Sequence, residues 1–175
     1  GYSAPDRAHV TEYVRPGILR VLDRLHDTPA FVVSVLDEVL VQNDAARALL
    51  GDASALTGLE RSGIYRWFAM PETERRRYPS ADHARQSRAL VASLRAAHGV
   101  MGARSRAGEI ATELSAPSAA FTGLWEDHEV RRPLEQHPTL LHPHPREIQV
   151  DRPAQSTHAP CHAPLLLTAP PARHA

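Results

Sequence analysis

Histidine and cysteine side chains crowd the last third of the chain, and these residue types could bind a metal ion. The candidates are His137, His142, His144, His158, Cys161 and His162. Imidazole and thiolate groups are good zinc ligands. Their spacing matches no closed zinc site, and the run from His142 to His144 overlaps an expected strand, where neighbouring side chains point to opposite faces. We therefore expect solvent-facing polar residues near turns here, and no metal centre.

Groups that could act in covalent catalysis are present but lack their usual frame. Cys161 has His158 and His162 nearby, yet all three lie in a proline-rich stretch with no helix terminus to activate the thiol. Ser115 and Ser118 lack the strand–turn–helix frame of a nucleophile elbow. The chain contains no glycine-rich loop for a phosphate. The sequence therefore predicts that the protein is not an enzyme.

Large aromatic side chains give a better candidate site. Trp67, Phe68, Phe121 and Trp125 fall on expected helices that should cover one face of a sheet. Such side chains either fill a core or line an apolar pocket that has one or two polar anchors. Both alternatives stay open for each of the four.

Polar anchors for a ligand in such a pocket are also available. The candidates are Arg88, His128 and Arg131, because arginine can pair bidentately with a carboxylate. His128 could instead tie down a helix end. Asn43 is expected to cap a helix rather than to touch a ligand.

The first elements of the chain have clear signals. A helix is expected over residues 15–25, because Pro16 suits a first helical turn and an apolar face recurs at helical spacing. That face consists of Ile18, Leu19, Leu22 and Leu25. A buried strand over residues 30–36 and its hairpin partner over 39–42 should follow, and then a short helix over 45–50.

The rest of the chain predicts a helical middle and a strand-rich end. Apolar positions at helical spacing indicate a long helix over residues 81–97 and shorter ones over 107–114 and 118–125. Strands are expected over 139–142, 147–151 and 165–168.

Composition limits the classes of protein. A chain of 175 residues that is 42% hydrophobic is long enough for one packed domain, and its net charge of zero argues against a self-sufficient DNA-binding domain. The single cysteine excludes an internal disulfide and fits a cytoplasmic location. No apolar run is long enough to span a membrane. The start at Gly1 suggests a segment cut from a longer chain.

The order of these parts resembles one family. The stretch from Val14 to Asp23, the run from Thr28 through the strand pair, and Asn43 to Leu49 are similar to the C-terminal ligand-binding domain of MmyB-like transcription regulators. The resemblance continues through Glu113-Leu114-Ser115 and residues 121–131. His142-Pro143 with Glu147 and Asp151 resembles the family's final hairpin, and the whole resemblance spans residues 14–170.

The resemblance implies a fold and a domain organisation. The fold would be α+β and PAS-like, with a five-stranded antiparallel sheet and helices packed on one face. Residues 1–13 would be a linker from a missing N-terminal helix-turn-helix domain of the Xre type, 14–170 the PAS-like ligand-binding domain, and 171–175 a tail. Departures from the family pattern include Gln42 and Arg152, where members often have tryptophan and tyrosine.

The resemblance also implies a function. The domain would sense a hydrophobic or fatty-acid-like small molecule and relay its presence to DNA-binding domains, in a regulator associated with antibiotic metabolism. It would carry no cofactor beyond a bound lipid-like ligand. DNA would be contacted only through the missing domain, and a homodimer is possible. The alternative is a dimerisation or protein-interaction module with a filled core and no ligand.

Overall fold

The computed structural model describes residues 14, 16–127, 139–141, 147–149 and 165–168. The first part of the chain contains α2 (Pro16–Arg24), β1 (Ala30–Val33), β2 (Val39–Gln42), α3 (Asp44–Leu50), and the 3-10 turns η1 (Ala53–Ala55) and η2 (Gly58–Arg61). The helical middle contains α4 (Gly63–Ala69), α5 (Pro71–Glu74), η3 (Arg75–Arg77), η4 (Ser80–Asp82), α6 (His83–Met101), α7 (Arg106–Ser115) and α8 (Ala119–Glu126). The last strands are β3 (Thr139–Leu141), β4 (Glu147–Gln149) and β5 (Leu165–Thr168).

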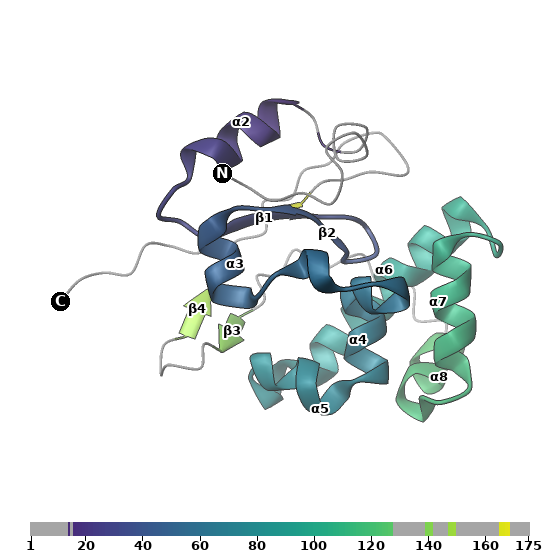
Figure 1. Ribbon diagram of the computed structural model, residues 1–175. Coiled ribbons are helices and arrows are strands. Elements are labelled where there is room, and N and C mark those ends of the chain that lie inside the picture. The colour runs from purple at the N-terminus through teal and green to yellow at the C-terminus, as the bar shows by residue number, and fades with distance from the viewer. Residues whose placement is uncertain (1–13, 15, 128–138, 142–146, 150–164, 169–175) are drawn as a thin grey trace.

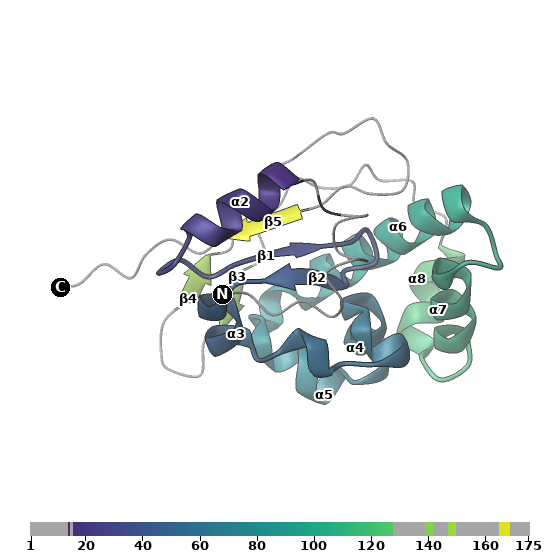
Figure 2. The ribbon, with the colours of Figure 1, turned by 45° about the horizontal axis from the view of Figure 1, so that its top comes forward.

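Helix α2, which the sequence predicts, lies across one face of the sheet (Figures 1 and 2). Leu22 is fully buried against Ala30, Val32 and Val41, and the other residues of the predicted apolar face pack around them. Because Cβ atoms alternate along a strand, Ala30 and Val32 of β1 point toward α2.

The opposite face of β1 is also covered. Phe31 and Val33 pack against Ala46 of α3, with Leu50 and Tyr78 beside them. All four residues of β1 are buried, so both of its faces need a cover. The expectation of helices on one face only is therefore corrected, since α2 and α3 lie on opposite faces (Figure 1).

The predicted five strands are present, but they do not form one sheet. The first sheet has the order β2-β1-β5, and a separate two-stranded sheet pairs β3 with β4. The hairpin of β1 and β2 is confirmed, whereas β5 pairs antiparallel with β1 from Ala30↔Thr168 to Val33↔Leu165 (Figure 2). The single five-stranded sheet is thus replaced by two smaller ones. Strand pairing across long connections is a tertiary choice that the period of a single strand does not encode.

A second apolar core holds the helical middle together. It lies among α4, α6, α7 and α8, and its fully buried members include Ile64, Leu94, Ile110, Leu114 and Phe121. Serine hydroxyls cap three of these helices, because the side chains of Ser62, Ser105 and Ser118 accept hydrogen bonds from the first helical turns. The helical core stands beside the sheet, α3 and the connection that follows it lead from the sheet to α4, and α5 lies below α4 in the view of Figure 1.

Candidate functional site

A cavity of about 330 Å³ lies between the sheet and the helices. Its apolar wall consists of Phe31, Val33, Val39, Leu50, Leu56, Met70 and Tyr78. Phe31 and Val33 come from the face of β1 that points away from α2, and Leu50 closes one side from the end of α3. The volume is at the lower end of the range of about 300–1,000 Å³ that is typical of small-molecule sites.

An ion pair occupies one side of the cavity. Arg66 of α4 donates its Nε–H to Glu74 Oε2 at 3.0 Å, and Glu74 is only 7% exposed. The same guanidinium donates through Nη1 to the carbonyl oxygens of Glu60 and Arg61. The charge of Arg66 is thus compensated by Glu74 and its other donors are used by backbone carbonyl groups. The pair therefore joins α4, α5 and η2 along this side of the cavity.

Arg77 is a second arginine that lines the cavity, and it differs from Arg66 in having no carboxylate partner among the described residues. It lies at the end of η3, lines the cavity and is exposed. Its guanidinium forms no ion pair with any residue in the described part of the chain. An arginine in this state can pair with an anionic group at the cavity mouth.

Gln42 holds the loop that follows α3 against the cavity. Its Oε1 accepts a hydrogen bond from Ala53 N at 2.7 Å, and its Nε2 donates to Gly51 O at 3.0 Å. The side chain is 4% exposed, and Gln42 lies opposite Phe31 in the β1–β2 ladder. Both ends of the amide are satisfied by backbone, so Gln42 shapes the wall rather than offering a free polar group.

Asn43 ties together three elements behind that wall. Its Oδ1 accepts from Ala30 N at 3.0 Å and from Ala46 N at 2.8 Å, and the second of these bonds confirms the predicted helix cap. Its Nδ2 donates to Leu25 O at 2.6 Å and to Thr28 O at 2.9 Å. The side chain thus joins the start of β1, the start of α3 and the residue that follows α2.

Asp52 lines the cavity, and the pKa of its carboxyl group is lowered. Hydrogen bonds from the hydroxyl and the backbone N–H of Ser54 lower the pKa of the Asp52 carboxyl below its ordinary value. Burial opposes the shift and Arg47 adds a smaller lowering effect. The carboxylate therefore stays ionised at neutral pH and caps η1.

The predicted aromatic residues come together, but in the helical core. The rings of Phe68 and Phe121 meet edge to face with their centroids 5.3 Å apart, and Phe121 stacks on Trp125 with a centroid distance of 5.4 Å. Trp67 is 1% exposed and donates its indole N–H to Ser87 Oγ at 2.8 Å. None of the four is among the residues that line the cavity. Their contact with a ligand stays a prediction.

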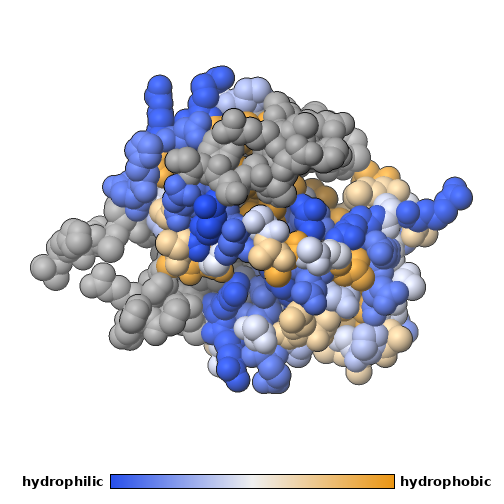
Figure 3. Space-filling view, viewed as in Figure 1, coloured by the Kyte–Doolittle hydropathy of each residue, from blue (hydrophilic) through white to orange (hydrophobic). Residues whose placement is uncertain are grey.

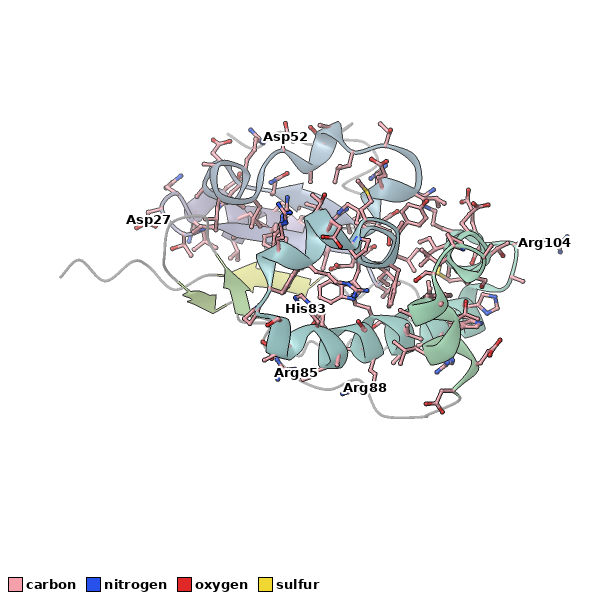
Figure 4. The ribbon with its side chains drawn as sticks, turned by 90° about the horizontal axis from the view of Figure 1, so that it is seen from below. Asp27, Asp52, His83, Arg85, Arg88 and Arg104 are labelled. Carbon is pink, nitrogen blue, oxygen red and sulfur yellow. The ribbon has the colours of Figure 1, made fainter. Side chains whose placement is uncertain are left out.

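The predicted anchors are scattered or lie outside the described residues. Arg88 is exposed on α6 and points away from the rest of the molecule in Figure 4, whereas His83 on the same helix points inward. His128 and Arg131 lie outside the described residues. Phe31, Val33 and Arg77 line the cavity but are not among the predicted site residues, although the period of two along residues 30–33 indicates that Phe31 and Val33 share a face.

The described residues also bear on metal binding and on membrane insertion. Among the described residues, no group of three or more His, Cys, Asp or Glu side chains could hold a metal ion. The histidine-rich candidates from His137 to His162 lie outside those residues. No helix in the described ranges is long and apolar enough to cross a membrane.

Comparison with known families decides what kind of domain this is. The sequence model of the MmyB-like transcription regulator ligand binding domain matches residues 14–175, which is almost the whole chain. The chain belongs to this family. Neither the curated proteins nor the solved structures contain a significant match. The MmyB-like family is a family of regulator ligand-binding domains and not of enzymes, and its match begins at Val14, the residue that packs beside α2 against the sheet.

Proposed function

We propose that this MmyB-like domain is the sensor of a cytoplasmic transcription regulator, and that it binds a hydrophobic or fatty-acid-like molecule in the cavity beside the sheet. Binding would be relayed to a helix-turn-helix domain on the N-terminal side. The observation that carries the proposal is a cavity with an apolar wall and with Arg77, which forms no ion pair within the described residues, at its exposed side, in a chain of a ligand-binding family. A cavity at this position favours a sensor over an interaction module with a filled core.

The chemistry of the wall supports an amphipathic ligand. Phe31, Val33, Val39 and Leu50 would take an alkyl chain, and burial of each methylene contributes about 0.8 kcal/mol. A volume of about 330 Å³ holds about ten groups of the size of a water molecule. Medium-length chains therefore fit best, with the carboxylate held at Arg77.

Signalling would follow from a shift of populations. A ligand changes the balance of two arrangements only to the extent that it binds one of them better. We propose that the arrangement of α2 is what differs, because α2 lies closest in sequence to the proposed DNA-binding domain.

Blocking the cavity tests where the ligand binds. Val39→Trp places a large side chain in the wall, and Val21→Trp makes the same change on the outer side of α2, where Val21 is 47% exposed. Thermal-shift and calorimetric titrations would use saturated fatty acids from octanoate to palmitate. We expect stabilisation of the wild type and of Val21→Trp, and its loss in Val39→Trp. Stabilisation by no fatty acid would contradict the proposal.

Three matched arginine variants test the anchor. Arg77→Gln removes the cation at the cavity mouth, Arg76→Gln removes its exposed neighbour, and Arg88→Gln removes the anchor that the sequence predicts. With decanoate, Arg77→Gln should weaken binding about tenfold, as expected for loss of one charged hydrogen-bonding partner. With decanol, which has no charge, the same variant should have little effect. A loss confined to Arg88→Gln would place the ligand elsewhere.

A further inference from the structure

We propose that Gln42 and Asn43 couple the cavity to α2, with α3 as the moving part between them. This proposal rests on the proposed function, because it describes how occupancy of the same cavity reaches the other face of the sheet. Both residues act as positioning residues and neither is assigned to the chemistry of ligand binding.

The first half of the coupling is on the cavity side. Gln42 holds Gly51 O and Ala53 N, and both of these residues line the cavity together with Leu50. A molecule that enters beside Leu50 therefore presses on a loop that is fixed to the end of β2. Movement of that loop must stretch these two hydrogen bonds or carry Gln42 with it.

The second half lies on the opposite face. Asn43 follows Gln42 directly, and its Nδ2 holds the carbonyl oxygen of Leu25, which directly follows α2. The same amide holds Thr28 O. These two bonds fix the end of α2 to the end of β2, and the apolar face of α2 packs on Val32 and Val41 of the same sheet.

Helix α3 links the two halves because both of its ends are held by this residue pair. Asn43 Oδ1 binds Ala46 N at the first turn, and Gln42 Nε2 binds Gly51 O just after the last turn. A helix of 7 residues is about 10 Å long and bends little. A ligand that displaces Leu50 and tilts α3 therefore moves Asn43 and changes its hydrogen bond to Leu25 O.

The central experiment needs no ligand. Gln42→Met keeps the length of the side chain and removes both tethers to the loop. Asn43→Ser keeps a good helix cap and removes the donor to Leu25 O and Thr28 O. Hydrogen exchange followed by mass spectrometry would compare residues 20–25 with α7, which lies far from this pair, in both single variants and the double variant.

The expected result is specific to α2. Gln42→Met should speed exchange in residues 20–25 about tenfold relative to α7, and it should add less than about twofold when Asn43 is already serine. Ser118→Ala, which removes the cap of α8, is the control for general loss of stability. If Asn43→Ser does not fold, Asn43→Asp replaces it, since a carboxylate keeps the acceptor and loses the donor.

Two outcomes of this comparison of variants overturn the proposal. Exchange of α2 that is unaffected by Gln42→Met excludes the coupling, and so do effects of the two variants that simply add. A second arm uses decanoate on the wild type and on Asn43→Ser. Decanoate should protect residues 50–56 in both proteins and alter α2 exchange only in the wild type. If decanoate changes hydrogen exchange of α2 equally in Asn43→Ser and in the wild type, the coupling is wrong. Failure of decanoate to bind the wild type would instead count against the proposed function.

Discussion

At the scale of single residues, the buried polar side chains act as fixed joints. Ser62 is fully buried and donates its hydroxyl to Leu36 O at 2.7 Å, while it also caps α4. Gln42, Asn43 and Ser87 are each buried and each bonded to a group from another part of the chain. Because an unmade hydrogen bond in the interior is costly, each of these side chains specifies one arrangement of its neighbours.

The bond between Trp67 and Ser87 should be measurable in stability. Ser87→Ala leaves the indole N–H of a tryptophan that is 1% exposed without a partner, so the free energy of unfolding should fall by about 1–3 kcal/mol. Urea unfolding measures it. Ser115→Ala is the matched control, because Ser115 is an exposed residue whose hydroxyl donates to Ala111 O in its own helix. Equal stabilities of the two variants would show that the indole finds another partner.

Asp52 predicts a small dependence of stability on acid. Its pKa is lower in the folded chain than in the unfolded one, so its contribution is complete above the unfolded pKa of about 3.9 and is lost as the pH falls through the folded pKa. Asp52→Asn keeps the shape and a capping oxygen but removes this titration. The stability difference between wild type and variant should therefore shrink below about pH 4, in unfolding curves at several pH values.

Asp23→Asn is the comparison for that experiment. Asp23 is an exposed residue on α2, and its replacement reports the general effect of removing one acidic charge. A stability difference for Asp52→Asn that stays constant from neutral pH into the acid range would contradict the prediction.

At the scale of elements, the position of α7 is fixed by close contact between its first turn and the loop that precedes it. A Cβ atom added to Gly108 would collide with the backbone carbonyl of Ala103, which cannot move aside as a side chain could. Arg106, in the same first turn, pairs with Glu38 at 3.1 Å and also donates to Gly58 O. The start of α7 is thereby held against both its own loop and the hairpin turn.

Replacement of two helical glycines by alanine should therefore change the stability of the protein in opposite directions. Alanine normally stabilises a helix interior by about 1 kcal/mol over glycine. Gly99→Ala in α6 should show a gain of this kind, because no atom lies within 4 Å of the added Cβ. Gly108→Ala should instead lose about 1–3 kcal/mol through overpacking. Thermal unfolding of both proteins measures the difference, and a gain in both would contradict the close approach.

At the scale of the whole molecule, the cavity belongs to no single element. It lies where the face of the sheet opposite α2 meets the helical middle, and its wall draws on β1, β2, α3, α4, α5, η3 and α6. Figure 3 shows that hydrophilic residues cover much of the described surface in the view of Figure 1, with smaller hydrophobic areas between them. A ligand that enters between the layers would gain apolar contacts from residues of both.

A ligand in the cavity should stabilise the whole domain. A molecule that binds only the folded chain adds about 2.7 kcal/mol at a concentration of 100 times its Kd, and about 1.4 kcal/mol for each further tenfold. Unfolding curves at rising decanoate concentrations should follow this logarithm in the wild type and stay flat in Val39→Trp. A gain that is the same in both proteins would indicate binding outside the cavity.

Sequence alone determined the parts of this protein whose signals are local. The amphipathic period of α2, the β1–β2 hairpin and the cap at Asn43 depend on residues close together in the chain, and all three are confirmed. The family resemblance is confirmed as well, because it rests on the order of these parts. Tertiary structure decided the rest. The pairing of β5 with β1 joins residues more than 130 positions apart, and the cavity exists because two layers fail to close on each other beside Phe31 and Tyr78. Empty volume is a property of how elements meet in space, so no spacing of aromatic residues along the chain could reveal it.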